Sequence, residues 1–347
     1  MRMSPSSERY ARQVRFSPFG MEGQKRLAQG FAVVVGMGAL GCVIANHLVR
    51  AGIGRIRLID RDIVSWSNLH RQLLYTEADA ESGVPKAEAA AAKLRTFNRQ
   101  VAIEAAAVDL NSGNAESLLA DADLIVDGTD HFGVRYLIND VAVKFGIPWI
   151  YGGAVGASGM TMTIVPGETP CYRCLFPSPP PPGSTDTCET AGVLPPIVDL
   201  IGSLQAMEAI KLLGGYKEQL HGALLHADLW KTDFSKMKTA GARRADCPCC
   251  GIRRFDYLEA VVRGKSEAVL CGRETVQIAP AEPLQLHLDE MAERLKSAGR
   301  VERNPWLLRL TLEDGITLVL FPDGRVLVQG TGDPDLARRI YDRILAP

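Results

Sequence analysis

A glycine-rich turn, GMGALG (36–41), follows directly on the apolar run FAVVVG (31–36), and this pair constrains the fold more than any other feature. Gly36, Gly38 and Gly41 have the GxGxxG spacing, and the stretch from Ala39 to Ala51 has the pattern of a helix. In this context the glycines allow a tight turn and let backbone N–H groups approach phosphate at a helix N-terminus. The sequence therefore predicts a nucleotide-binding strand–turn–helix unit, and the motif alone does not distinguish NAD from ATP.

Further apolar runs alternate with helical patterns along the first half of the chain. Strands are predicted at RIRLID (55–60), VAIEAAAV (101–108), DLIVDG (123–128) and IPWIYGG (147–153). Helices are predicted at 85–97 and 133–145, and later at 197–213, with two more strands at 159–167 and 223–229. This alternation is typical of an α/β fold, which we expect to be a Rossmann-like, mostly parallel sheet with helices on both faces.

The length of 347 residues is suited to two domains. We expect a first domain over 1–254 and a small C-terminal α+β domain of unknown role over 255–347. The second should run strand, helix, three short strands, helix, because two Asp-Gly pairs (314–315 and 323–324) are strong hairpin signals. Four consecutive prolines mark an extended crossover segment at about 175–192 in the first domain.

Charge and hydropathy exclude several classes of protein. Lys and Arg number 39 against 40 Asp and Glu, so the net charge of −1 argues against a general nucleic-acid binder and against a basic membrane-surface protein. The chain has no uninterrupted apolar stretch of about 18 residues and no apolar signal core at its N-terminus. We therefore expect a cytoplasmic protein without nucleic-acid or membrane partners.

Polar and charged residues gather where the predicted strands end. Asp60 ends the second strand, where a carboxylate can accept hydrogen bonds from ribose hydroxyls. Asp127 and Asp130 follow the fourth strand, and a carboxylate facing a triphosphate there is a candidate Mg²⁺ ligand. The remaining candidates for the nucleotide site are Asp62, Asn68, Arg71, Gln72 and Lys86. Cations beside a glycine-rich turn favour ATP over NAD, and we expect Arg71 and Lys86 to face solvent at a phosphate site.

The cysteines are clustered. Cys171 and Cys174 form one CxxC pair, and Cys247 and Cys250 form a second within CPCC. Two CxxC motifs in a chain of this size predict a structural Zn²⁺ site with four tetrahedral cysteine ligands. Cys249 lies inside the second motif and is the alternative fourth ligand, although the spacing favours Cys250.

Several motifs resemble those of the MoeB/ThiF family, the bacterial relatives of ubiquitin-activating enzymes. They are ERYARQ, GMGALG, the D-x-D-x-V-x-x-S-N-L-x-R-Q run, the Pro-Lys pair at 85–86, GTD, CYRC, GSLQAMEAIK and CPCC, in order over residues 8–251. The resemblance implies an ATP-dependent adenylyltransferase that activates the C-terminal glycine of a small β-grasp sulfur-carrier protein, ThiS-like or MoaD-like. The pathway would be that of thiamine, molybdopterin or thiolated tRNA.

The resemblance also implies roles for individual residues. Asp60 would hold the ribose, Asn68, Arg71 and Lys86 would meet the phosphates, and Asp130 would carry Mg²⁺. Arg12 matches an arginine that reaches the ATP of the partner subunit, which implies a homodimer. The sequence departs from the family at Ala39, which replaces a glycine but keeps its backbone N–H, and at His131, which replaces an asparagine.

Cys188, beyond the proline tract, matches the cysteine implicated in covalent capture of the activated carrier. Residues 255–347 do not resemble a rhodanese, so we expect an external sulfur donor such as a cysteine desulfurase or a rhodanese. Two other functions remain as alternatives, an NAD-dependent oxidoreductase and a non-catalytic scaffold half of an activating complex. Arg71, Lys86 and Asp130 argue against a scaffold, since such halves usually lack these residues.

Overall fold

The computed structural model describes residues 8–181, 190–260, 267–270, 274–280 and 284–345. The chain divides into two compact units, Met1–Val261 and Val262–Pro347, with the division seven residues beyond the predicted boundary at 254/255. Cys188 lies outside the described residues.

The first unit is built on a mixed sheet of eight strands. Five parallel strands stand in the order β3 (Ala102–Ala106), β2 (Arg55–Ile59), β1 (Phe31–Val35), β4 (Leu124–Asp127) and β5 (Trp149–Val155). Three antiparallel strands extend it beyond β5, namely β6 (Ser158–Ile164), β7 (Ala223–Asp228) and β8 (Asp233–Lys238). The Rossmann-like, mostly parallel sheet predicted from the sequence is confirmed.

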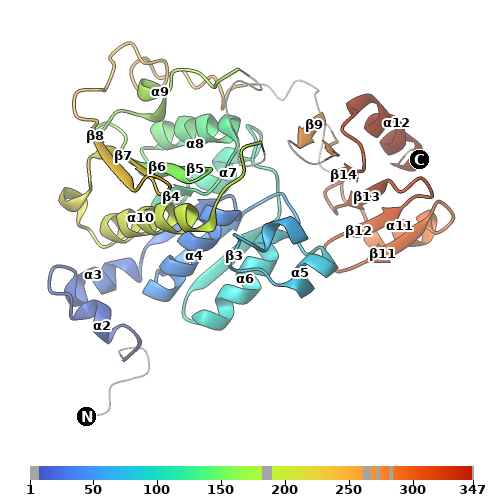
Figure 1. The fold of residues 1–347 in the computed structure, drawn as a ribbon, viewed down its shortest axis with the longest axis horizontal. Coiled ribbons are helices and arrows are strands. Elements are labelled where there is room, and N and C mark those ends of the chain that lie inside the picture. The colour runs from blue at the N-terminus through green and yellow to red at the C-terminus, as the bar shows by residue number, and fades with distance from the viewer. Residues whose placement is uncertain (1–7, 182–189, 261–266, 271–273, 281–283, 346–347) are drawn as a thin grey trace. The chain divides into compact units, whose positions relative to one another are not determined.

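Helices cover both faces of this sheet (Figure 1). One face packs against α4 (Ala39–Ala51), α6 (Lys86–Phe97) and α10 (Pro195–Leu213). The other packs against α7 (Ala115–Leu119) and α8 (Phe132–Phe145). The shorter helical segments of this unit are α2 (Ala11–Val14), α3 (Gly20–Leu27), η1 (Trp66–Asn68), α5 (Glu77–Ser82), α9 (Tyr172–Leu175) and η2 (Lys217–Gln219).

The central strand β1 shows why the apolar runs form this sheet. All five of its residues are buried, and successive side chains enter opposite cores. Ala32 and Val34 pack with the α4 side, whereas Val33 and Val35 pack with the α8 side. Because a strand buried on both faces shows no alternation of apolar and polar residues, FAVVV reads as a continuous hydrophobic run.

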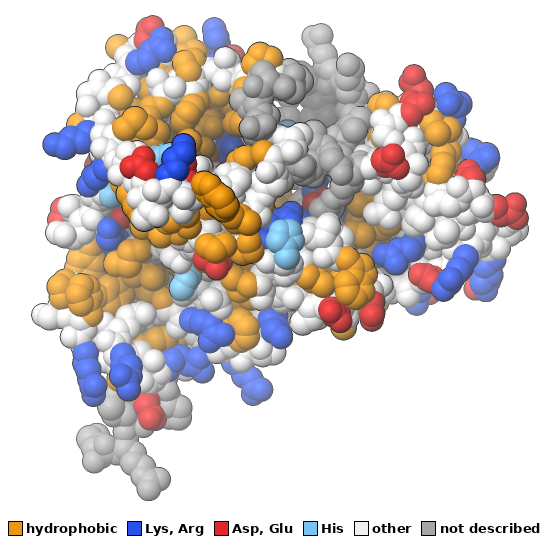
Figure 2. Space-filling model, viewed as in Figure 1, with side chains coloured by type: hydrophobic (Ala, Val, Ile, Leu, Met, Phe, Trp, Pro, Cys, Tyr) orange, Lys and Arg blue, Asp and Glu red, His pale blue; other side chains and the backbone are white. Residues whose placement is uncertain are grey.

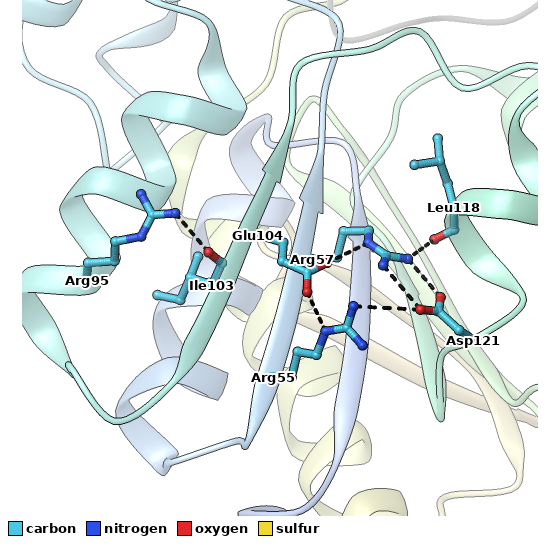
Figure 3. A network of polar contacts seen from close by, with 7 residues as sticks. All are labelled: Arg55, Arg57, Arg95, Ile103, Glu104, Leu118 and Asp121. Carbon is cyan, nitrogen blue, oxygen red and sulfur yellow. Dashed lines mark hydrogen bonds and ion pairs between the residues drawn. The ribbon is translucent and has the colours of Figure 1, made fainter.

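A charged network closes the α7 side of the sheet near its β3 edge (Figure 3). Arg57 of β2 donates Nε to Glu104 of β3 at 3.0 Å and Nη1 to Asp121 at 2.8 Å. Arg55 donates Nε to the other oxygen of Glu104 at 2.5 Å and lies 4.0 Å from the ring centre of Phe31. Helix α7 is only five residues long and covers little of the sheet here, and these ion pairs occupy the surface where a longer helix would pack.

The second unit is a six-stranded antiparallel sheet with two helices. The strand order is β11 (Arg300–Arg303), β12 (Leu308–Thr311), β13 (Thr317–Leu320), β14 (Val326–Gln329), β10 (Thr275–Ile278) and β9 (Glu267–Leu270). Apolar side chains of α11 (Leu288–Leu295) and α12 (Pro334–Leu345) share a core with β10, β12, β13 and β14.

Three features of the strands differ from the sequence prediction. The stretch AVLCGRETVQI forms two paired strands, β9 and β10, rather than one. Strands β8 and β11 were not predicted, because their exposed side chains show little of the apolar alternation that marks a half-buried strand. Both are edge strands, where one side of the backbone has no neighbour in the sheet.

Within the described ranges, none of the helices combines the length and the apolar character needed to cross a membrane.

Candidate nucleotide site and cysteine cluster

The carboxyl ends of β1, β2 and β4 meet at the point where the strand order reverses. Strand β1 lies between β2 and β4, and the chain leaves it by the glycine-rich turn. Backbone hydrogen bonds from Gly36 N to Ile59 O (2.7 Å) and from Gly128 N to Val35 O (2.8 Å) continue the sheet to this edge. In open α/β sheets this is where a crevice for ligands forms.

Two of the three glycines of the turn, Gly36 and Gly41, are required by close backbone packing. A Cβ on Gly41 would lie 1.9 Å from the carbonyl oxygen of Gly36, and Gly36 itself has a φ of +88°. Gly38 is different, because a Cβ there would meet nothing closer than 3.9 Å. Gly38 is the N-cap of α4, and Ala39 begins the helix. The open space at the helix N-terminus is therefore available to a phosphate group.

Asp60 joins the turn to the segment that follows β2. Its Oδ2 accepts a hydrogen bond from Met37 N at 2.7 Å, and its Oδ1 accepts one from Asp62 N at 2.7 Å. Burial raises the pKa of Asp60, while Lys86 opposes the rise. A carboxylate offers about four acceptor positions, so lone pairs remain for ribose hydroxyls.

Lys86 is buried, with 4% of its surface exposed, and its Nζ lies 3.0 Å from Asp62 Oδ2. The expectation that Lys86 faces solvent is therefore wrong. The reason is the position of α6, whose first residue is Lys86 and whose next apolar residue, Ala87, enters the core. Tyr75 lies beside the pair and donates its hydroxyl to Met37 O at 2.6 Å, with Lys86 O at 3.2 Å.

Two buried amides near the turn have polar atoms without a partner among the described residues. They are Asn68 Nδ2 and Gln72 Oε1, on side chains that are 0% and 3% exposed. Asn68 Oδ1 accepts a hydrogen bond from Ser65 N, which fixes the amide, and Gln72 Nε2 lies 4.0 Å from a Cβ built on Gly38. An unpaired buried polar atom is costly, so a polar ligand is expected to complete this site. Arg71 lies on the same loop and donates Nη1 to Ser67 O.

At the end of β4 the two aspartates have different environments. Asp127 is completely buried, and its carboxylate accepts hydrogen bonds from Thr129 N, Thr129 Oγ1 and Arg135 Nε. Asp130 is exposed. A carboxylate oxygen is a ligand that Mg²⁺ favours, and Asp130 is the accessible one of the two, so Asp130 is the residue that would hold a magnesium ion here.

Arg12 is not brought to this site. It is exposed on α2, and the neighbouring Gln13 donates to Ala51 O, at the C-terminal end of α4. The glycine-rich turn lies at the other end of that 13-residue helix, about 20 Å away.

The four predicted metal ligands converge. The Sγ atoms of Cys171, Cys174, Cys247 and Cys250 all lie within 4.8 Å of one another, with individual separations of 3.9, 3.6 and 3.4 Å. Four thiolates at about 2.3 Å from one Zn²⁺ would be about 3.8 Å apart in a tetrahedron. The cluster therefore fits a structural zinc ion, which would tie the start of the crossover segment to the end of the first unit.

Cys249 lies outside this cluster. It is buried, and its Sγ accepts a hydrogen bond from Asn139 Nδ2 at 3.2 Å. Asn139 Oδ1 in turn accepts from Tyr172 N. The thiol of Cys42, beneath the glycine-rich turn, is also buried, and burial raises its pKa to about 12, which makes it a poor nucleophile.

A pocket of about 410 Å³ opens at the β5–β6 turn. The turn at Gly156 lies beyond the carboxyl end of β5, so the pocket belongs to the same edge of the sheet as the glycine-rich turn. Its other walls come from residues 191–194, Asp228 and the exposed Trp230. Residues 191–194 lie at the C-terminal end of the crossover segment.

Residues 10–249 match the ThiF family. The chain belongs to this family. It is 44% identical over 336 residues to the sulfur carrier protein ThiS adenylyltransferase of Bacillus subtilis, an alignment that covers 96% of this chain and 98% of the relative. It is 43% identical over 249 residues to a sulfur carrier protein adenylyltransferase of Thermus thermophilus, covering 70% of this chain and 90% of the relative.

Among solved structures, Escherichia coli MccB with ATP superposes with a TM-score of 0.62 at 25% identity. The match covers 70% of this chain and 75% of MccB. The ThiF family assignment thus agrees with the fold.

Sequence analysis missed two residues of this region, Tyr75 and Arg135. Neither belongs to a motif whose chemistry indicates a nucleotide, and both act on backbone carbonyls rather than on a ligand. A charged residue in the first turns of a buried helix was the available signal for Arg135, but its partners come from β4 and β5.

Proposed function

We propose that this protein is an ATP-dependent adenylyltransferase that activates the C-terminal carboxylate of a ubiquitin-like sulfur-carrier protein. The observation that carries the proposal is the open N-terminus of α4 facing the Asp62–Lys86 pair and the unpaired amides of Asn68 and Gln72. The names of the two relatives support it, since both are sulfur-carrier adenylyltransferases.

In the proposed reaction a carboxylate oxygen of the carrier attacks the α-phosphorus of ATP, and pyrophosphate leaves. The reaction needs alignment and charge neutralisation more than proton transfer. Asp60 would hold the ribose, while Asn68, Arg71 and Lys86 would bind the phosphates. Gln72, Asp62 and the turn Gly36–Gly41 would complete the nucleotide site. A Mg²⁺ ion held by Asp130 would neutralise charge on the departing pyrophosphate.

The carrier is proposed to be ThiS-like. The alignment with the Bacillus subtilis relative covers 96% of this chain and so includes most of the second unit, whereas the Thermus thermophilus alignment covers 70%. Most of the unit Val262–Pro347 is thus shared with a relative whose name specifies ThiS. A MoaD-like carrier is the alternative, and a direct comparison of the two carriers as substrates distinguishes them.

A homodimer is proposed on the position of Arg12. Because Arg12 lies near the far end of α4 from its own glycine-rich turn, it can serve a nucleotide site only in another subunit. Hydrophobic side chains gather over α10 on the face drawn in Figure 2. Met207 of α10 is 45% exposed. An apolar surface of this kind is suited to burial between subunits.

The pocket beside Trp230 is proposed to admit the C-terminal segment of the carrier. It lies at the same edge of the sheet as the nucleotide site, and its backbone walls at Gly156 and Gly192 leave room for a chain of small residues. A Trp230→Ala substitution should raise the KM for the carrier and leave the affinity for ATP unchanged.

Cys188 is proposed to capture the activated carrier. Its thiolate would attack the carbonyl carbon of the acyl-adenylate, AMP would leave, and a thioester would remain for an external sulfur donor such as a cysteine desulfurase or a rhodanese. A cytoplasmic location is proposed because clustered buried thiols suit a reducing compartment.

The proposal is tested by incubating the protein with ATP, Mg²⁺ and a ThiS-like or MoaD-like carrier in separate reactions. Pyrophosphate release and a carrier mass increased by one AMP are expected, with the ThiS-like carrier preferred. Failure of both carriers to release pyrophosphate, together with tight binding of NAD, would favour an oxidoreductase instead.

A further inference from the structure

Arg135 connects the carboxyl ends of β4 and β5 beneath the proposed nucleotide site. It lies in the first turns of α8, and its side chain is 7% exposed. Its Nε donates to Asp127 Oδ2 at 3.1 Å, and its Nη2 donates to Thr129 O at 2.6 Å and to Gly152 O at 3.1 Å. One guanidinium thus contacts a side chain of β4, the turn after β4 and the backbone of β5.

The turn after β4 is held from both sides by this arrangement. Asp127 Oδ1 accepts from the backbone N–H and the hydroxyl of Thr129, while Arg135 takes the carbonyl of the same residue. Asp127 O is fixed by Gln205 Nε2 at 2.7 Å. Every polar group of Thr129 is therefore bound, and the next residue is Asp130.

The same turn packs closely against the glycine-rich turn. A Cβ on Gly128 would lie 2.5 Å from Gly36 O, so the two backbones are in contact. A displacement of the 128–130 turn would consequently change the position of Asp130 relative to the N-terminus of α4. Burying the Arg135 guanidinium is costly in free energy. In return, it orients backbone carbonyl groups that apolar side chains could not orient.

We propose that Arg135 is a positioning residue that sets the location of the Asp130 carboxylate for the Mg²⁺ that accompanies ATP. It acts through Asp127 and Thr129 and contacts no nucleotide itself. This inference rests on the proposed function, because it assumes that Asp130 holds the metal.

The test is a double-mutant cycle on nucleotide binding, measured by calorimetry on the full chain without a carrier. Binding of ATP is measured with Mg²⁺ and again with a chelator, for wild type, Arg135→Lys, Asp130→Asn and the double variant. Lysine keeps the positive charge beside Asp127 but cannot reach both carbonyls with one fork. We expect Arg135→Lys to weaken Mg²⁺-dependent ATP binding about tenfold, the size expected from losing charge-assisted hydrogen bonds.

Binding without Mg²⁺ should stay unchanged in Arg135→Lys. In the Asp130→Asn background the same substitution should have no further effect, since the residue through which it acts is gone. Arg57→Lys is the matched control, because Arg57 is also an ion-paired arginine, and its partners Glu104 and Asp121 belong to the network of Figure 3 rather than to the turn after β4. It should bind ATP as wild type does.

Three results would overturn the inference. These are wild-type Mg²⁺-dependent binding by Arg135→Lys, an equal loss with and without Mg²⁺, and an undiminished effect in the Asp130→Asn background. If Arg135→Lys fails to fold, Asp127→Asn/Arg135→Met removes both buried charges together and enters the same cycle. Failure of the proposed function is distinct, because it would appear as wild-type protein whose ATP binding does not respond to Mg²⁺.

Discussion

The Nζ of Lys86 lies 3.0 Å from Asp62 Oδ2, and the lysine is almost completely buried beside the glycine-rich turn. The pair holds a positive charge at the first residue of α6, where the helix N-terminus also favours an anion. A cation kept in place before the nucleotide arrives requires little reorganisation when charge develops on the phosphates.

Replacing this cation should greatly reduce the adenylation rate and have a smaller effect on the stability of the fold. Lys86→Met keeps most of the stem, and we expect carrier-dependent pyrophosphate release to fall about 10²–10³-fold, as on loss of an aimed charged donor. Arg71→Ala should have a loss of similar size. Lys93→Ala is the matched control, since Lys93 is exposed on the same helix. Wild-type rates in Lys86→Met or Arg71→Ala would contradict the assignment of the phosphate site.

The cysteine cluster should contain one zinc ion per chain. Cys174→Ser is expected to lose the metal and to lower the midpoint of thermal unfolding by several degrees, because metal binding contributes directly to folding free energy. Cys249→Ala removes a neighbouring thiol that hydrogen-bonds Asn139 instead of joining the cluster, and it should retain the zinc. Elemental analysis of freshly reduced protein decides the matter, and zinc loss in Cys249→Ala but not in Cys174→Ser would reverse the ligand assignment.

The Arg–Glu–Asp network at the β3 edge should make stability depend on acid pH. Hydrogen bonds from Arg55 and then Arg57 lower the pKa of Glu104, and a hydrogen bond from Arg57 lowers the pKa of Asp121. A carboxylate with a lowered folded-state pKa stabilises the protein above its unfolded value, near 4.5 for Glu104, and this stability is lost as the pH falls through the folded value.

Glu104→Gln should therefore reduce the free energy of unfolding at pH 7 by up to about 1 kcal/mol, as for a partly exposed pair, and by less at pH 3. Denaturant unfolding at both pH values and at high salt measures the difference. Arg55→Gln should show the same pH dependence, and the double variant should show little added loss. A Glu104→Gln effect that is equal at pH 3 and pH 7 would show that the ion pairs do not contribute.

Arg12 should act across the subunit boundary. Arg12→Ala and Arg71→Ala are each expected to be inactive alone, and mixing them under subunit exchange should restore about a quarter of wild-type activity through heterodimers with one intact site. A mixture of Arg71→Ala with Lys86→Met is the control. Each of these substitutions inactivates the site of the subunit that carries it, so both sites of the mixed dimer should be inactive and no activity should be recovered. Absence of recovery in the first mixture would show that Arg12 does not act in trans.

Cys188 should form a covalent adduct with the carrier. Enzyme, carrier, ATP and Mg²⁺ quenched without reductant are expected to yield an adduct that hydroxylamine releases, and Cys188→Ala should still form pyrophosphate but no adduct. Cys42→Ala serves as the control, since its thiol is buried. Normal sulfur transfer by Cys188→Ala would mean that the external donor attacks the adenylate directly.

The sequence by itself determined the elements that depend on short-range patterns. The run FAVVV predicted a strand buried on both faces, and the glycines at 36, 38 and 41 predicted the turn, because local backbone requirements are written in consecutive residues. The two CxxC pairs likewise indicated the four-cysteine cluster across the 72 residues between Cys174 and Cys247, because this spacing is typical of thiolate metal ligands.

Tertiary structure decided what depends on contacts between distant strands. No residue near Lys86 in the chain indicated that its ammonium group would be buried in an ion pair with Asp62. In the same way, no residue near Arg135 indicated its hydrogen-bond partners, which are Asp127, Thr129 and Gly152. The edge strands β8 and β11 were also missed, because pairing with one neighbour leaves no apolar period in the sequence. Burial and partnership belong to the packed sheet, whose parallel strands bring residues far apart in sequence to one edge.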